Sequence, residues 1–136
     1  MKALRFALLS VPLAVACESP SSPTSIRIET QSPTYQLGTA VTFTVVNAGS
    51  SEVFLSYCCN VGVAVDRWQS SRWLSGSAGG CVAICSMVPI SLPAHGSYVD
   101  STAVADTGRY RLHVGVSFSR TAEPDWSPTS NAFEVR

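Results

Sequence analysis

Charge is scarce in this chain of 136 residues, of which only 13% are Asp, Glu, Lys or Arg. The nine basic and nine acidic residues cancel, and the only lysine is Lys2. Because no basic patch or acidic tail is left to attract a polyanion or a polycation, we predict no nucleic-acid partner. Hydrophobic residues make up 46% of the chain, enough to fill a core, and the length predicts one domain with a short appendage.

Motifs of established catalytic chemistry are also missing. The sequence has no G-x-S-x-G, no H-E-x-x-H and no phosphate-binding glycine loop, and no acidic pair has a spacing suited to acid–base catalysis. Its two histidines are His95, expected in a turn, and His113, expected on the solvated face of a strand. We therefore predict that the chain is not an enzyme and has no catalytic residue, no metal site and no cofactor.

The N-terminus has the form of an export signal. Lys2 and Arg5 precede the uncharged, largely apolar residues 6–15, which as a helix would span about 15 Å, too short for a membrane crossing. The following Leu13-Ala14-Val15-Ala16-Cys17 resembles the lipobox of bacterial lipoproteins. That resemblance implies cleavage before Cys17 and acylation of its thiol and its new amine, which holds a protein stably on a membrane. The alternative is an ordinary signal peptide with Ala14-Val15-Ala16 as its cleavage site.

Residues 18–24 are rich in Ser and Pro and are expected to form a tether. We therefore divide the chain into a lipoprotein-type signal peptide (1–16), a lipidated Cys17 with its tether (17–24) and a folded domain (25–136). In such lipoproteins, a residue other than Asp after the cysteine implies delivery to the outer membrane, and Glu18 fits that pattern. The expected location is the cell envelope, and its outer membrane where the organism has two membranes.

Four further cysteines lie in the folded domain: Cys58, Cys59, Cys81 and Cys85. An even number in an exported chain predicts two disulfides, with three possible connectivities. Bonds from the first pair to the second avoid a strained ring between neighbours, and each would contribute about 3 kcal/mol of stability. The order of the partners stays open. The alternative is a Cu(I) or thiol-redox site built from Cys81, Cys85 and Met87, because soft sulfur ligands suit Cu(I).

Alternation of apolar and polar residues predicts an all-β domain. Apolar side chains recur at every second position from Ile26, from Val41 and from Val53, and again at Phe133 and Val135. The clearest series sets one apolar face of a strand (Tyr110, Leu112, Val114, Val116 and Phe118) against a polar face (Arg109, Arg111, His113, Gly115 and Ser117). Six to eight short strands separated by Gly- and Pro-containing turns predict an antiparallel β-sandwich. Trp68 and Trp73 are expected to cover its core.

A tyrosine corner is predicted by Asp106-x-Gly108-x-Tyr110-x-Leu112. In this motif a Tyr near the start of a strand donates its hydroxyl hydrogen to a backbone carbonyl a few residues upstream. Asp106, Gly108 and Tyr110 are therefore assigned a structural role.

Several blocks of sequence, taken in order, resemble bacterial immunoglobulin-like domains carried on exported lipoproteins. They are Tyr35-x-Leu37-Gly38, Val41-Thr42-Phe43-Thr44-Val45, Leu92-Pro93-x-x-Gly96-Ser97, Gly108-x-Tyr110-Arg111-Leu112 and Ser130-Asn131-x-Phe133-x-Val135. The resemblance implies an immunoglobulin-like β-sandwich of about seven strands with an accessory or interaction role.

Binding is expected at the loops of one end of the sandwich, because such loops usually carry function. Loops 48–51 and 120–129 are expected to share that end, and the second holds Glu123, Asp125 and Trp126, an aromatic residue between charges and prolines. The alternative for Trp126 is packing against the edge of the sandwich. The function expected from sequence is a non-enzymatic, lipid-anchored envelope protein that binds a protein partner. A peptidase-inhibitor-like binder is one subtype, and the copper or thiol-redox protein is the alternative.

The two-disulfide prediction is tested by counting thiols. The mature chain, denatured in the presence of a maleimide before any reduction, is expected to gain no label on the four domain cysteines, and reduction is expected to expose all four. Two labelled cysteines before reduction would contradict the prediction.

Overall fold

The computed structural model describes residues 25–56, 62–76, 88–120 and 123–136. The described residues form strands, turns and loops, and none of them belongs to a helix long and apolar enough to cross a membrane. Cys17, the four other cysteines, Met87 and the tether lie outside the described ranges.

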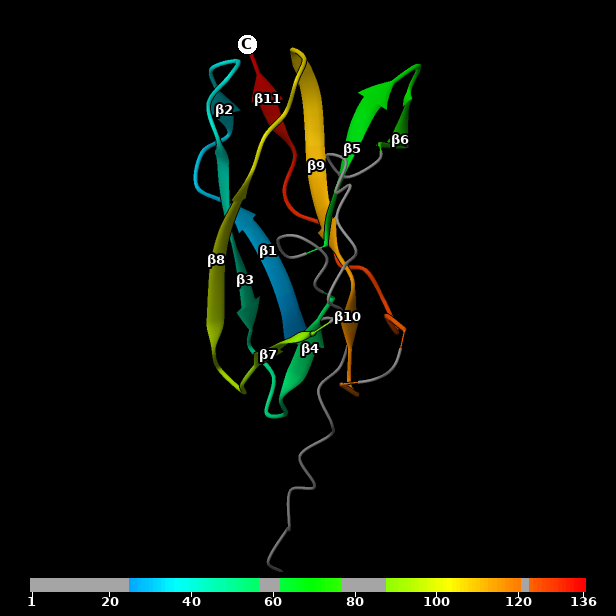
Figure 1. The fold of residues 1–136 in the computed structure, drawn as a ribbon. Coiled ribbons are helices and arrows are strands. Elements are labelled where there is room, and N and C mark those ends of the chain that lie inside the picture. Colours follow the sequence, from blue (N-terminus) through cyan, green and yellow to red (C-terminus); the bar gives the residue numbers. More distant parts are fainter. Residues whose placement is uncertain (1–24, 57–61, 77–87, 121–122) are drawn as a thin grey trace, which may run out of the picture.

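Two sheets make the body of the domain (Figure 1). The first contains, in spatial order, β1 (Ile26–Thr30), β3 (Val41–Asn47) and β8 (Ser97–Thr102). The second contains β2 (Thr34–Tyr35), β11 (Phe133–Val135), β9 (Gly108–Val114), β5 (Val63–Gln69) and β6 (Arg72–Gly76). All pairings within these sheets are antiparallel except that of β2 with β11. The predicted all-β, immunoglobulin-like sandwich is confirmed.

The core is the layer in which the two sheets meet. Every second residue of β3 is fully buried, and β9 buries Tyr110, Leu112 and Val114 in the same way. The fifteen residues of the core cluster are aliphatic or aromatic, and fully burying one such side chain stabilises a fold by about 1.5–3 kcal/mol. The period-two pattern in the sequence therefore identified the inward faces of β1, β3 and β9 correctly. Trp68 and Trp73 are not among the residues that pack against this core.

A smaller sheet closes the end of the sandwich drawn at the bottom of Figure 1. It contains β10 (Val116–Ser117), β4 (Val53–Leu55) and β7 (Ile90–Leu92). Gly115 separates β9 from β10 at a place where a Cβ atom would lie 2.8 Å from Ser56 Oγ and 2.7 Å from Pro124 Cγ. Glycine is required there because a side chain would collide with Ser56 and Pro124.

The expected burial of Phe118 is wrong. Its side chain is 45% exposed, because the strand ends at Ser117, which is itself buried and donates its hydroxyl hydrogen to the carbonyl of Ser119 at 2.8 Å. Two successive buried residues, Val116 and Ser117, break the alternation that the sequence predicted.

Asn47 connects the loops at the end of the sandwich that the smaller sheet closes. Its side chain is fully buried, and Nδ2 donates to the carbonyls of Ser51 (2.8 Å), Leu92 (3.2 Å) and Pro93 (3.0 Å). Its Oδ1 accepts the amide hydrogen of Gly49 at 3.0 Å. A buried amide is tolerated when its polar atoms are bonded in this way.

The hydrogen bond expected of a tyrosine corner is present. The Tyr110 hydroxyl donates to the carbonyl of Asp106 at 3.0 Å, and the side chain is buried. Gly108 has φ +151°, and a Cβ atom there would lie 3.2 Å from Arg67 Nε. Burial raises the pKa of the Tyr110 hydroxyl, an effect that the nearby Arg67 opposes and Asp106 reinforces. The neutral, donating form is therefore the one that the fold stabilises.

Tyr110→Phe is expected to lower the free energy of unfolding by about 1–2 kcal/mol, because the carbonyl of Asp106 loses its donor while the ring packing is kept. Chemical denaturation with an unchanged m-value measures the loss. A midpoint equal to that of the parent protein would contradict a stabilising corner.

Candidate functional site

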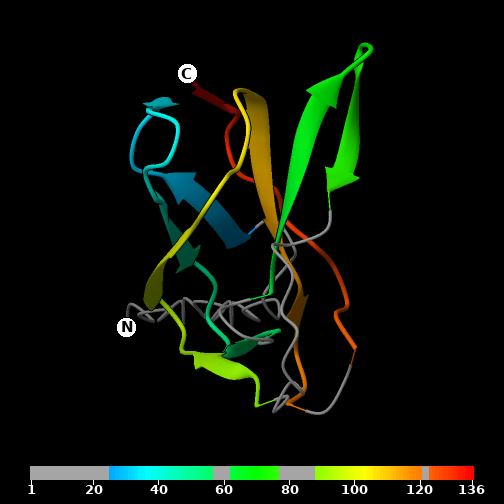
Figure 2. The same cartoon turned by 45° about the horizontal axis from the view of Figure 1, so that its top comes forward.

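The hairpin of β5 and β6 extends beyond the rest of its sheet (Figure 2). Its two-residue turn is formed by Ser70 (φ 51°) and Ser71 (φ 62°), the left-handed conformations of a type I′ turn. Each costs about 1–2 kcal/mol in a residue other than glycine. Trp68 and Trp73 are paired across the strands next to the turn, with ring centroids 5.1 Å apart and planes at 64°. Such an aromatic pair stabilises a fold by about 0.5–1.5 kcal/mol, which offsets part of the strain in the turn.

The tryptophans lie on the outward face of the sheet, together with arginines of β9. Asp66 is paired with Arg111 across β5 and β9, and residues two apart share a face, so Trp68 lies on the same side as Arg109 and Arg111. Trp68 is 39% exposed, and the Arg111 guanidinium carbon lies 4.7 Å from the centroid of the Trp73 ring. We call Trp68, Trp73, Arg109 and Arg111 the aromatic–arginine face. The expectation that both tryptophans cover the core is wrong, because the register turns them outward.

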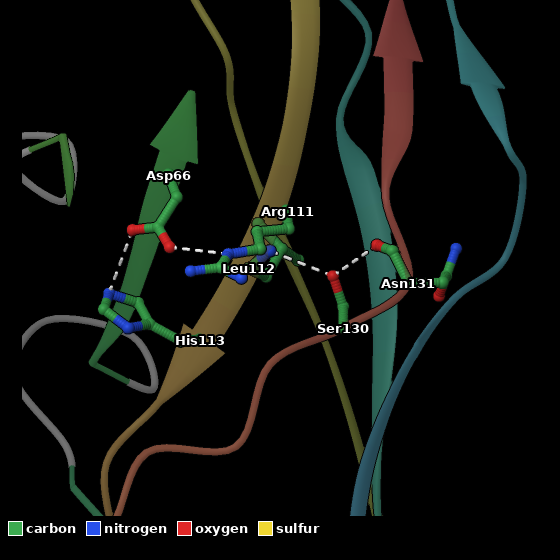
Figure 3. Close-up of polar contacts among 6 residues, drawn as sticks. All are labelled: Asp66, Arg111, Leu112, His113, Ser130 and Asn131. Carbon is green, nitrogen blue, oxygen red and sulfur yellow. Dashed lines mark hydrogen bonds and ion pairs between the residues drawn. The ribbon is translucent and has the colours of Figure 1, made fainter. Parts of the chain in front are cut away.

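Asp66 is paired with Arg111 (Figure 3), the residue whose guanidinium contacts the Trp73 ring. The Asp66 carboxylate is only 3% exposed, and Oδ2 accepts a hydrogen bond from Arg111 Nε at 2.8 Å. His113 Nε2 lies 3.6 Å from Oδ1, and both of these atoms are buried without a hydrogen bond. A carboxylate this deeply buried depends on the guanidinium for its stability, since an unpaired charge there is costly. His113 lies on the outward face of β9 as expected, with 25% of its side chain exposed, but its Nε2 atom is buried.

Ser130 ties the opposite side of β9 to the last strand (Figure 3). Its hydroxyl accepts the amide hydrogen of Leu112 at 2.9 Å and donates to the carbonyl of Asn131 at 2.7 Å. The Asn131 side chain in turn bonds the hydroxyl and the amide of Thr30, at 2.8 and 3.1 Å. These bonds link the two sheets and hold β9, which carries the arginines, in a fixed frame.

Positive charge is in excess around the hairpin. Arg67 lies 3.7 Å from the Asp106 carboxylate, and Arg111 is paired with Asp66. Arg72 and Arg109 are exposed, and neither has an ion pair within the described part of the chain. An arginine without a counter-charge on an exposed surface favours contact with a carboxylate of another molecule.

A shallow cavity of about 300 Å³ adjoins Arg109. Its walls come from β2, β9, β11 and their flanking residues, and the charged groups in it are Arg109, Glu134 and Arg136. Glu134 is bonded to Arg136 at 2.7 Å, which leaves the Arg109 guanidinium as its unpaired charge. The cavity lies next to the aromatic–arginine face on the side of β2, so this edge of the face is concave.

The loop expected to bind a partner is used inside the domain. Asp125 Oδ2 accepts the amide hydrogen of Phe118 at 2.9 Å. Trp126 is partly buried against the core, its backbone bridges Val116, and its ring centroid lies 4.8 Å from that of Phe118. Glu123 is exposed. Loops 48–51 and 123–129 do lie at the same end, since β4 and β10 are paired there (Figure 1).

Among the described residues, no group of three or more His, Cys, Asp or Glu could hold a metal ion. The sulfur residues proposed for Cu(I), Cys81, Cys85 and Met87, lie outside the described ranges, as do Cys58 and Cys59. Both the disulfide and the copper hypotheses therefore stay predictions.

Comparison with other proteins leaves the family open, since no protein-family model and no curated protein matches the chain. Solved structures with some likeness include the alkylpurine DNA glycosylase AlkC of Pseudomonas fluorescens bound to abasic-site DNA (17% identity, TM-score 0.39). The alignment covers 82% of this chain but only 30% of AlkC. The CARDB domain of PF1109 from Pyrococcus furiosus, in complex with di-metal ions, is 12% identical with a TM-score of 0.38, covering 82% and 87% of the two chains. The ASH/PapD-like domain of human CEP192 is 16% identical with a TM-score of 0.34, covering 98% and 94%.

Asp66→Asn is expected to lower the free energy of unfolding by about 2 kcal/mol, because it leaves the Arg111 guanidinium without its counter-charge. Glu29→Gln is a matched control, since Glu29 is exposed and its loss is expected to cost no more than about 0.5 kcal/mol. Equal denaturation midpoints for the two variants would show that the Asp66–Arg111 pair does not stabilise the domain.

Proposed function

We propose that this chain is a non-enzymatic, lipid-anchored protein of the cell envelope whose immunoglobulin-like domain binds a protein partner. Residues 1–16 direct export, acylated Cys17 anchors the mature chain, and residues 18–24 form the tether. The features that support export and anchoring are the short apolar run, the lipobox-like Leu13 to Cys17 sequence and the even number of remaining cysteines.

The aromatic–arginine face carries the binding proposal. Trp and Arg are the residues most enriched among those that dominate the energetics of protein interfaces. Trp68 is 39% exposed on this face. Trp73 and Arg111 are held by each other and by Asp66, so little side-chain entropy is lost when a partner binds. Arg109, which has no ion pair within the described residues, favours a partner with an acidic surface.

The peptidase-inhibitor subtype has less support. An inhibitor of that kind would present the end loops, but Asp125 and Trp126 are bonded or packed within the domain. We therefore place binding on the sheet face and not on the predicted loop of Glu123, Asp125 and Trp126.

Site-directed photo-crosslinking in intact cells tests the binding face. A photoreactive amino acid at Ser75, an exposed position of β6 on the same face as Trp73, is expected to give one discrete adduct with an envelope protein. Trp68→Ala is expected to reduce that adduct at least about tenfold, the change that corresponds to about 1.4 kcal/mol of binding energy.

The matched control places the same photoreactive residue at Ser101, an exposed position of β8 in the other sheet. Binding by the aromatic–arginine face would be contradicted if the Ser101 probe captured the same protein in the same yield as the probe on the face. It would also be contradicted if Trp68→Ala left the adduct unchanged. Circular dichroism of the Trp68→Ala variant checks that the β-sheet signal is kept.

A further inference from the structure

The domain begins at the end opposite its hairpin. Ser25 is the first described residue, and its carbonyl accepts the amide hydrogen of Ala48 at 2.8 Å, next to the loop that leads into β4. β10 is paired with β4, so Phe118 and Trp126 lie at this same end. Figure 1 shows this end at the bottom and the tip of the β5–β6 hairpin at the top. The ten residues from the start of β9 to the end of β10 separate the two ends by about 30 Å.

An aromatic cluster occupies the end at which the chain enters. Phe118 is 45% exposed and contacts the partly buried Trp126, with ring centroids 4.8 Å apart. Arg120 is also exposed, and its guanidinium carbon lies 5.7 Å from the centroid of the Phe54 ring. We call these four residues the Phe118 cluster. Phe118 is the exposed ring of this cluster, since Phe54 is buried and Trp126 is partly buried. An exposed aromatic ring beside an arginine is typical of protein surfaces at the level of lipid headgroups.

The charged side chains around the cluster are Arg120 and the three carboxylates of Glu52, Glu123 and Asp125, so the net charge there is negative. The Glu52 carboxylate accepts a hydrogen bond from the Ser91 hydroxyl, and Asp125 accepts one from the amide of Phe118. Exposed Arg120 is matched by exposed Glu123. Strong attraction to anionic lipid is therefore not expected, and a contact would come from the aromatic rings in the headgroup region.

The tether is short enough to bring this end to the membrane. Eight residues separate the membrane from Ser25 if Cys17 carries the anchor, and eight residues reach at most about 29 Å even when fully extended. We propose that the Phe118 cluster rests in the headgroup region of the anchoring membrane, which directs the aromatic–arginine face outward. This inference rests on the proposed lipid anchor.

The test uses the acylated mature chain, reconstituted in phosphatidylcholine vesicles that contain a lipid with a quencher near its headgroup. The chain has three tryptophans, so Trp68→Phe/Trp73→Phe leaves Trp126 as the only reporter, and Trp126→Phe leaves the two of the hairpin. Quenching of Trp126 is expected to be at least about twofold stronger than quenching of the hairpin pair, because short-range quenching requires proximity to the membrane. Phe118→Ser, at an exposed position, is expected to reduce the quenching of Trp126.

Two outcomes overturn the inference: equal quenching of the two reporters, or unchanged Trp126 quenching in Phe118→Ser. Mass spectrometry of the N-terminal peptide separates this failure from failure of the proposed anchor. A mature N-terminus without fatty acid would refute the anchor itself, whereas an acylated chain with unquenched Trp126 would refute only the orientation.

Discussion

Apolar side chains that meet between two sheets are the constraint on which the rest of this structure depends. The constraint is strict, because side chains alternate across a strand and a shift of one residue would turn the whole apolar set of β9 to the solvent. The same alternation builds the binding face, since the residues between Tyr110, Leu112 and Val114 are forced outward. Arg111 therefore points away from the core for the same reason that Leu112 fills it. Core and candidate site are two faces of a single strand.

Polar groups decide how the sandwich is closed and how firmly the face is held. Asn47 bonds the loops at one end, and the Tyr110 hydroxyl bonds the carbonyl of Asp106 in the segment that precedes β9. Ser130 links β9 to the segment that leads into the final strand. Each is buried, and each has partners on the backbone, so it favours one arrangement of the strands over compact alternatives. The exposed residues of the aromatic–arginine face depend on this frame. Trp73 is positioned by Arg111, Arg111 by Asp66, and β9 by Ser130.

The distribution of aromatic residues gives the domain two different ends. The hairpin end carries Trp68 and Trp73 with an excess of arginine, which suits an acidic protein surface. The end at which the chain enters carries the contacting rings of Phe118 and Trp126 and no excess of arginine, and the exposed Phe118 ring suits a lipid headgroup layer. In the proposed function these features are complementary, because an anchored binding module must present its face away from the membrane.

The sequence by itself determined the all-β class, the inward residues of β1, β3 and β9 and the Asp106–Tyr110 contact. These depend on residues a few positions apart, where periodicity and local motifs are informative. Only the tertiary structure decided that Asp66 meets Arg111, 45 residues away, and that Trp68 faces outward. The hairpin carrying Trp68 lacks the Asn-Gly or Asp-Gly signal of its turn type, and Ser70 and Ser71 adopt that turn only at a cost. Phe118 was misjudged for the same reason. Which strand pairs with which, and where a strand pairing ends, depends on contacts between distant segments, and a local sequence pattern does not record them.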